Sequence, residues 1–254
     1  MSTALILSGG GARAAYQVGV LRTVSEIVDV ERINPFPVIS GSSAGAINAA
    51  LLACESHHFG DSVRQLETLW TNLKSESVHG IGTGAVFMSL WRLFRSMLQE
   101  GYSAQKTWSL LDNSPLRALL GRAVDFGKLR ERLERGDLEA LAISALAYRA
   151  GISLSFFEAR HDVEDWDRHR RVGKSASLTL DHLMASAAIP GIYPAVRIGN
   201  EYYGDGAIRQ SAPLSPALHL GARKLFVIGV SHNPKEAAPE TGVPGAIVRP
   251  RWRT

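Results

Sequence analysis

Cysteine is almost absent from this chain of 254 residues, in which Cys54 is the single example. One cysteine excludes an intrachain disulfide framework and a metal site built from several thiolates. Cys54 follows the apolar run from Ala49 to Ala53, so we expect it to be a buried packing residue rather than a reactive thiol. We infer a reducing setting, and the cytoplasm is the location that fits it best.

Long hydrophobic stretches are absent as well. No run of about 18 apolar residues occurs, so the sequence predicts no transmembrane helix. The first apolar stretch, Ala4 to Leu7, is too short for a secretory signal peptide and has no basic flank. With 45% hydrophobic and 20% charged residues, and no evident linker, the composition predicts one globular domain with a sizeable core.

Lysine is scarce, because only six of the 28 basic residues are lysines and the others are arginines. The basic residues are spread along the chain rather than gathered into one stripe, which argues against a nucleic-acid partner. The formal net charge is +4. A mildly basic surface of this kind favours anionic membranes or anionic substrates.

Short apolar runs alternate with helical patterns in the first fifth of the sequence. Residues 4–7 and 37–40 are predicted to be buried strands, and residues 12–28 and 44–54 are predicted to be helices. The apolar residues expected on one face of the first helix are Tyr16, Val20, Val24 and Ile27. This order predicts a parallel sheet with helices on both faces. Both glycine-rich turns then follow the carboxyl ends of strands, where such sheets place their sites.

Further elements are expected downstream. Helices are predicted at residues 61–75, from Ser114-Pro115 onward and at 180–188, and strands at 138–148 (in part), 152–157, 196–198, 201–203 and 224–230. The last of these strands is expected to be buried. Residues 160–173 are dense in charges of both signs and are predicted to be a solvated loop. Residues 232–254 are rich in proline, glycine and charge, which predicts a loosely ordered tail.

A serine lies at the centre of the pentapeptide from Gly41 to Gly45, directly after an apolar strand and before a small-residue helix. The G-x-S-x-G pattern holds a serine on a sharp turn with its hydroxyl exposed, and the glycines let the backbone fold tightly around it. A serine hydroxyl becomes a nucleophile only when a base takes its proton. Ser43 is therefore a candidate nucleophile.

Three consecutive glycines, Gly9 to Gly11, follow the first strand and open the first helix. Their backbone N–H groups, together with the helix dipole, suit an oxyanion hole. Arg13 either adds positive field there or is a surface arginine. Gly9, Gly11 and Ala14 also fit a dinucleotide-binding fingerprint. That fingerprint needs an acidic residue after the second strand, and none is present there, so we disfavour it.

The general base has two candidates on the residues alone. Asp205 lies between Gly204 and Gly206 after a predicted strand, and from such a turn a carboxylate can reach Ser43 directly. Taken alone, however, Asp-Gly is typical of a simple hairpin turn. A Ser-His-Asp triad would instead need a histidine, and His232, just past a predicted strand, is the best placed of the eight.

Three motifs together resemble the patatin-like phospholipase family: Gly9 to Arg13, Gly41 to Gly45, and Asp205 to Ala207. The segment from Ala185 to Pro194 also resembles that family's proline-containing stretch, and the similarity extends from about Leu5 to Val230. The resemblance implies a three-layer α/β/α fold with a mostly parallel central sheet. It implies a hydrolase domain over residues 1–231.

The same resemblance implies hydrolysis of lipid acyl esters by a Ser43–Asp205 dyad, with no catalytic histidine, metal or cofactor. The remaining implied site residues are Gly9, Gly10, Gly11 and Ala12 in the oxyanion hole and Arg13, Gly41, Gly45 and Gly206 in support. Ala14 stands where the family often has another glycine, which is a small change on a helix. Family members often continue further, so the chain is expected to be a truncated or minimal version. A non-catalytic lipid-binding relic of the fold is the alternative to an enzyme.

The implied partner is a phospholipid or another acyl lipid, met through peripheral contact with a membrane. Residues 86–98 form a strongly amphipathic helical pattern, preceded by Gly80, Gly82 and Gly84. Such a segment is either a helix buried against the core or a mobile cap, spanning about residues 78–101, that settles into a lipid interface.

Overall fold

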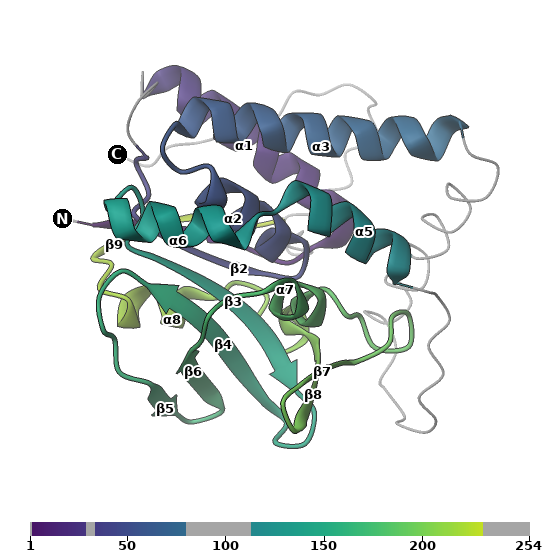
Figure 1. Cartoon of the computed structure of the whole chain (residues 1–254), viewed down its shortest axis with the longest axis vertical. Helices are drawn as coiled ribbons and strands as arrows, with labels where there is room; N and C mark the ends of the chain where they lie inside the picture. Colours follow the sequence, from purple (N-terminus) through teal and green to yellow (C-terminus); the bar gives the residue numbers. More distant parts are fainter. Residues whose placement is uncertain (1, 29–33, 80–112, 231–254) are drawn as a thin grey trace, which may run out of the picture.

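A nine-stranded sheet forms the centre of the computed structural model, which describes residues 2–28, 34–79 and 113–230 (Figure 1). The strand order is β5-β6-β4-β3-β2-β1-β9, and β8 pairs with the end of β3 and with β7. Strands β9, β1, β2 and β3 run parallel to one another. The strands are β1 (Thr3–Leu7), β2 (Val38–Ser42), β3 (Ala140–Ala147), β4 (Ile152–Ala159), β5 (Trp166–Arg168), β6 (Arg171–Ser175), β7 (Val196–Ile198), β8 (Glu201–Asp205) and β9 (Lys224–Ile228).

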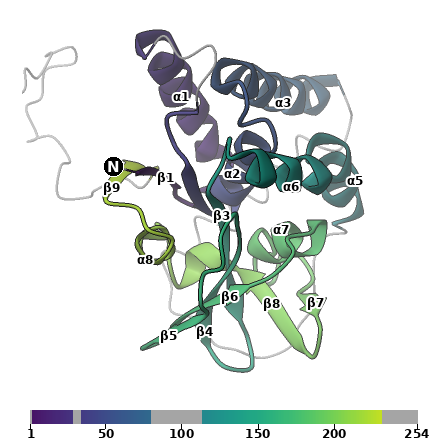
Figure 2. The same cartoon turned by 60° about the vertical axis from the view of Figure 1, so that its left-hand side comes forward.

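Helices cover both faces of this sheet. Figure 2 shows α2 and α6 on one face and α8 on the other, with α1 and α3 beside α2. The helices are η1 (Gly11–Ala14), α1 (Ala15–Ile27), α2 (Ala44–Cys54), α3 (Phe59–His79), α5 (Ser114–Ala123), α6 (Phe126–Arg135), α7 (Leu180–Ser186), η2 (Gly206–Ile208) and α8 (Leu214–His219). The predicted three-layer α/β/α fold with a central parallel sheet is therefore confirmed.

Alternate residues of each buried strand serve the two helical layers. In β1, Leu5 and Leu7 belong to the core beneath α1 and α2, whereas Ala4 and Ile6 pack with Ala217 on α8. Successive side chains of a strand point to opposite faces. A strand covered on both sides must then be apolar throughout, which explains the continuous apolar run at residues 4–7.

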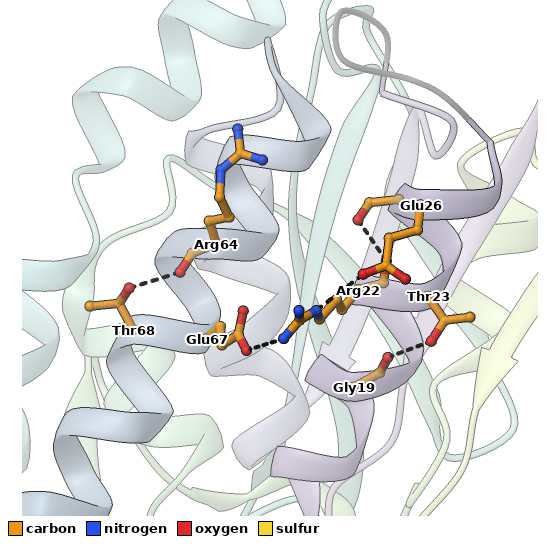
Figure 3. A network of polar contacts seen from close by, with 8 residues as sticks. Gly19, Arg22, Thr23, Glu26, Arg64, Glu67 and Thr68 are labelled. Carbon is orange, nitrogen blue, oxygen red and sulfur yellow. Dashed lines mark hydrogen bonds and ion pairs between the residues drawn. The ribbon is translucent and has the colours of Figure 1, made fainter.

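Helices α1 and α3 lie side by side in the outer layer, joined by polar contacts at their surface (Figure 3). Arg22 contacts Glu26 at 3.2 Å within α1 and Glu67 of α3 at 2.8 Å. These side chains are about half exposed, so solvent screens each ion pair and its contribution to stability is small. The apolar residues beneath them hold the two helices in place.

Residues 160–165 form a largely exposed loop, as predicted, but the prediction is wrong for residues 166–173. This segment contains β5 and the start of β6, which pair antiparallel with each other, while β6 pairs parallel with β4. Trp166 is buried because its indole stacks on Phe157 and on His219 of α8. One large aromatic ring thus fixes this edge of the sheet, despite the charged residues around it.

Two predicted faces also differ from the structure. The buried residues of α1 are Gln17, Val18 and Leu21, while Tyr16 and Ile27 are 64% and 76% exposed. Strand β9, predicted to be buried, is an edge strand of the described sheet with Val227 46% exposed. Cys54 is buried, as predicted.

Two segments singled out in the sequence lie outside the described residues: the amphipathic stretch 86–98 and the tail 232–254. No helix within residues 2–28, 34–79 and 113–230 has the length and apolar character needed to cross a bilayer.

Candidate active site

Ser43 occupies the sharp turn between β2 and α2. Its backbone has φ 54° and ψ −131°, a conformation that a residue with a side chain rarely adopts. The flanking glycines allow the chain to pack tightly around this turn. A Cβ on Gly41 would lie 2.5 Å from the carbonyl oxygen of Gly45. A Cβ on Gly45 would lie 2.3 Å from the carbonyl oxygen of Leu7. The G-x-S-x-G pattern is therefore needed for a close approach between β1, β2 and α2.

Asp205 reaches this turn from the end of β8. The Ser43 hydroxyl donates a hydrogen bond to Asp205 Oδ2 at 2.5 Å. The other carboxylate oxygen, Oδ1, accepts the backbone N–H of Ala207 at 2.8 Å, which caps η2. The backbone N–H of Asp205 donates to the carbonyl of Ala188 at 2.8 Å. Gly206 follows directly as the first residue of η2. Hydrogen bonds thus fix both the backbone and the side chain of Asp205, and its carboxylate faces Ser43.

The Ser43–Asp205 pair is buried, and this differs from the exposed hydroxyl that the sequence pattern predicts. Ser43 is 5% exposed and Asp205 is 3% exposed. Burial raises the pKa of Asp205 to about 6, although the hydrogen bonds from Ser43 and Ala207 act to lower it. A carboxyl group with this pKa is ionised near neutral pH and accepts a proton more readily than an ordinary aspartate.

The glycine-rich loop lies directly against the serine. A Cβ on Gly9 would lie 3.1 Å from Ser43 Cβ and 2.4 Å from Ala207 Cβ. The backbone N–H of Gly9, however, donates to the carbonyl of Ser211 at 3.0 Å, so this group is already engaged. That contact contradicts the expectation that Gly9 supplies an oxyanion donor.

Gly10, Gly11 and Ala12, the next three residues of the loop, differ from Gly9 in this respect. The backbone N–H groups of Gly10, Gly11 and Ala12 have no hydrogen-bond acceptor among the described residues. These groups stand at the start of η1, next to the turn that carries Ser43. Arg13, also in η1, follows them. The loop can therefore still present up to three donors to a developing negative charge.

Comparison with known proteins identifies the family to which this arrangement belongs. The model of the patatin-like phospholipase family matches residues 5–218, which is most of the chain. The protein is a member of the patatin-like phospholipase family. The matched residues include the glycine-rich loop, the serine turn and Asp205.

Two relatives and one solved structure illustrate the similarity. The cUMP-AMP-activated phospholipase of Escherichia coli is 31% identical over 96 residues, covering 38% of this chain and 28% of that protein. Calcium-independent phospholipase A2-gamma of Oryctolagus cuniculus is 24% identical over 216 residues, covering 85% of this chain and 25% of that protein. VipD from Legionella pneumophila shares the fold, with a TM-score of 0.51 at 14% identity over 90% of this chain and 49% of that chain.

The chain therefore spans about a quarter of the length of the two phospholipases that it matches. Both relatives carry the name phospholipase, as does the family.

Buried serine hydroxyl groups hold the turn of the patatin-like site in place. The backbone N–H of Ser43 donates to Ser186 Oγ at 2.9 Å, and this hydroxyl donates to the carbonyl of Ser144 at 2.7 Å. Ser144 Oγ lies 2.9 Å from Ser155 Oγ. The sequence predicts no role for Ser186, although its hydroxyl group lies in the otherwise mostly apolar segment from Ala185 to Pro194. Ser186 fixes the backbone of the strained turn.

A network of buried amide side chains contacts the backbone just before the glycine-rich loop. Gln17 Nε2 donates to the carbonyl of Ser8 at 2.8 Å, and Asn48 Nδ2 donates to Gln17 Oε1 at 2.8 Å. Trp70 Nε1 in turn donates to Asn48 Oδ1 at 2.8 Å. Gln17 and Asn48 are fully buried. Each of these two amide residues stands within an apolar helical pattern in the sequence. Because a buried polar group requires a hydrogen-bond partner, such a position indicates a residue with a structural contact.

No histidine among the described residues forms a hydrogen bond with Ser43 or Asp205. His182, in α7, instead contacts Thr179, and burial lowers its pKa. His232 lies outside the described residues. Within the described part of the chain, no group of three or more His, Cys, Asp or Glu side chains is arranged to hold a metal ion.

Proposed function

We propose that the protein is a serine hydrolase of lipid acyl esters, of the phospholipase A or esterase type, that works through a Ser43–Asp205 dyad. The observation that carries this proposal is the 2.5 Å hydrogen bond from the Ser43 hydroxyl to the buried Asp205 carboxylate. The strained turn and the neighbouring glycine-rich loop support it. The substrate class follows from the family, whose description and relatives name phospholipases.

The first half-reaction forms an acyl-enzyme. Ionised Asp205 takes the hydroxyl proton while Ser43 Oγ attacks the acyl carbon, and the N–H groups of Gly10, Gly11 and Ala12 stabilise the oxyanion. As the tetrahedral intermediate collapses, the bond to the leaving alcohol breaks. Asp205 then returns its proton to the alcohol oxygen.

The second half-reaction releases the acid. Asp205 takes a proton from a water molecule, which attacks the acyl carbon of the Ser43 ester. The bond between the acyl carbon and Ser43 Oγ breaks, and the proton returns from Asp205 to the serine. A single carboxyl group thus alternates between base and acid, and its raised pKa suits both roles near neutral pH.

Labelling and turnover test the nucleophile together. We expect the purified protein to hydrolyse a short-chain aryl ester and to react with a fluorophosphonate probe at Ser43. Ser43→Ala should abolish both. The matched control is Ser42→Ala on the same turn, because the Ser42 hydroxyl donates to carbonyl groups of Gln210 and Ser211 and not to the carboxylate. Labelling at Ser42, Ser40 or Ser8 would refute the assignment.

The alternatives predict different outcomes. A Ser-His-Asp triad requires His232→Gln to lose activity, whereas the dyad requires that variant to stay active. A non-catalytic lipid-binding relic of the fold requires the wild-type protein to show neither turnover nor labelling of Ser43.

A further inference from the structure

Two turns lie next to each other at the lower edge of the sheet in Figure 1. The first joins β3 to β4 and the second joins β5 to β6. The backbone N–H of Ser153, at the start of β4, donates to the carbonyl of Arg170 in the second turn at 3.0 Å. Ser153 is also the register partner of Arg171 in β6. Residues that are about 20 positions apart in sequence thus share one surface.

Five exposed arginines gather on this surface, which we call the cationic face: Arg149, Arg168, Arg170, Arg171 and Arg209. Arg209, which directly follows η2, also belongs to this face, because a Cβ on Gly151 would lie 3.9 Å from its Nη2. Two carboxylates are close by, Asp167 on β5 and Glu201, whose Oε1 accepts the backbone N–H of Arg149. The arginines outnumber them, so the face is positive.

None of the five guanidinium groups forms an ion pair with a described carboxylate. The helical layer behaves differently, because Arg22, Arg64, Arg117, Arg130 and Arg135 are all paired there. Arg122, Arg197 and Arg223 are exposed and also form no ion pair with a described carboxylate, but the cationic face gathers five such side chains in one place.

Arg170 is held in an unfavourable backbone conformation. Its φ is 59°, in the left-handed region that a two-residue hairpin turn favours for glycine or asparagine. Apart from Ser43, no other residue with a side chain has a positive φ in the described part of the chain. An arginine where glycine would be less strained indicates that the side chain itself has a use.

The cationic face and the Ser43–Asp205 pair lie toward the same end of the sheet. Ala145 of β3 is the register partner of Asp205, and Arg149 follows four residues later, in the turn after β3. Exposed apolar and aromatic residues lie among the arginines, namely Tyr148, Tyr202 and Ile208. Aromatic side chains mixed with cations are typical of surfaces that rest at a bilayer interface.

We infer that the cationic face docks on an anionic phospholipid bilayer and thereby brings the active-site end of the sheet to its lipid. This inference rests on the proposed function for its purpose, since only an enzyme acting on acyl lipids needs such an approach. A bilayer fits better than a nucleic acid, because Ile208 and the two tyrosines contribute apolar surface between the charges. The attraction should weaken as salt screens it.

Vesicle co-sedimentation tests the docking. The full chain carrying Ser43→Ala, which prevents hydrolysis, is titrated with phosphatidylcholine vesicles that contain or lack phosphatidylserine. We expect binding to require phosphatidylserine and to fall with added salt. Each arginine near an anionic surface contributes roughly fivefold in affinity, so removing Arg168, Arg170 and Arg171 together should weaken binding about a hundredfold.

Arg170→Gly separates charge from folding. Because glycine relieves the positive φ, the variant should unfold at the same or a higher temperature while binding vesicles about fivefold more weakly. Arg170→Lys should keep the binding. The matched control is Arg223→Gln, which removes an exposed arginine before β9, at the opposite end of the sheet, and should change nothing. Equal losses in the Arg170→Gly and Arg223→Gln variants would overturn the inference.

Two further measurements distinguish failure of the docking from failure of the proposed hydrolase. With Ser43 intact, Arg170→Gly should leave hydrolysis of a short-chain aryl ester unchanged. Ester hydrolysis without arginine-dependent vesicle binding refutes the docking alone, whereas arginine-dependent binding by a protein that hydrolyses no ester supports docking and refutes the hydrolase. Tighter binding of an RNA oligonucleotide through the same arginines would overturn the assignment of a membrane as the partner.

Discussion

At the scale of single residues, the proposed chemistry depends on two opposing effects on the pKa of Asp205. Burial favours the neutral acid, while the hydrogen bonds from Ser43 and Ala207 favour the carboxylate. The sequence names all three residues but cannot show which effect is larger. In the structure burial is larger, and the pKa of Asp205 is raised to about 6.

This pKa leads to a prediction for the pH dependence of catalysis. Because the base must be ionised to accept the serine proton, kcat/KM for a neutral aryl ester should rise through about pH 6 and level off above it. Asp205→Asn should lower kcat/KM by roughly 10²–10⁴-fold and remove its rise through about pH 6, the acidic limb of the pH profile. His182→Gln is the control, since His182 contacts Thr179 rather than the dyad. A limb that survives Asp205→Asn but disappears in His232→Gln would contradict the dyad.

Some residues of the site could be predicted from the sequence and others could not. Ser43, Asp205 and the glycine-rich loop stand in local patterns with a known backbone geometry. Ser186 and Gln17 act through contacts with residues 143 and 9 positions away, and no local pattern marks such partners. The contact from Gly9 to Ser211 is of the same kind, which is why Gly9 was wrongly expected to be an oxyanion donor.

At the scale of elements, the end of β9 supports the glycine-rich loop. The backbone N–H of Val230 donates to Ser8 Oγ at 3.1 Å, just before the loop. A Cβ on Gly10 would lie 2.1 Å from Val230 Cγ2. The segment after β9 therefore sets the position of the loop, and with it the direction of the N–H groups assigned to the oxyanion hole.

A pair of substitutions tests this dependence. Gly10→Ala should displace the loop and lower kcat by about 10²–10³-fold, the effect of losing one oxyanion donor, with a smaller effect on KM. Adding Val230→Ala removes the colliding methyl groups and should restore much of kcat. Val230→Ala alone serves as the control and should have a small effect. Independent effects in the double variant would show that the two residues are not coupled through this contact.

The elements themselves were predictable to different degrees. The parallel strands at the centre of the sheet are continuous apolar runs because helices cover both faces. Such runs are recognisable in the sequence, so these strands could be predicted. Strands β5 and β6 lie at an edge, where Arg168, Arg171 and Lys174 face solvent, and their charge was typical of a loop. The face of α1 was misassigned because Gln17, which is polar, is buried through the amide network.

At the scale of the whole molecule, the fold buries an ionisable group, Asp205, whose ionisation lowers the stability of the folded protein. An aspartate has an ordinary pKa near 3.8, whereas the folded protein raises that of Asp205 to about 6. Below the lower value the group is neutral in both states. As the pH rises through the higher value, the unfolded chain is already ionised and the folded chain must bury a charge. The stability that the neutral acid contributes is therefore lost between about pH 4 and pH 6.

This loss should be measurable in global unfolding. The pKa change corresponds to about 3 kcal/mol. Asp205→Asn cannot ionise, so the free energy of unfolding of the variant minus that of the wild type should increase by up to about this amount from pH 4 to pH 8. Urea denaturation at a series of pH values measures the difference. Asp162→Asn, which removes an exposed carboxylate, is the control for charge alone. A difference for Asp205→Asn that stays flat with pH would contradict the burial of an ionised dyad. If the difference rises with pH as expected, ionised Asp205, the proposed catalytic base, lowers the stability of the fold at neutral pH. That relation is expected when a protein retains a buried charge for its chemistry.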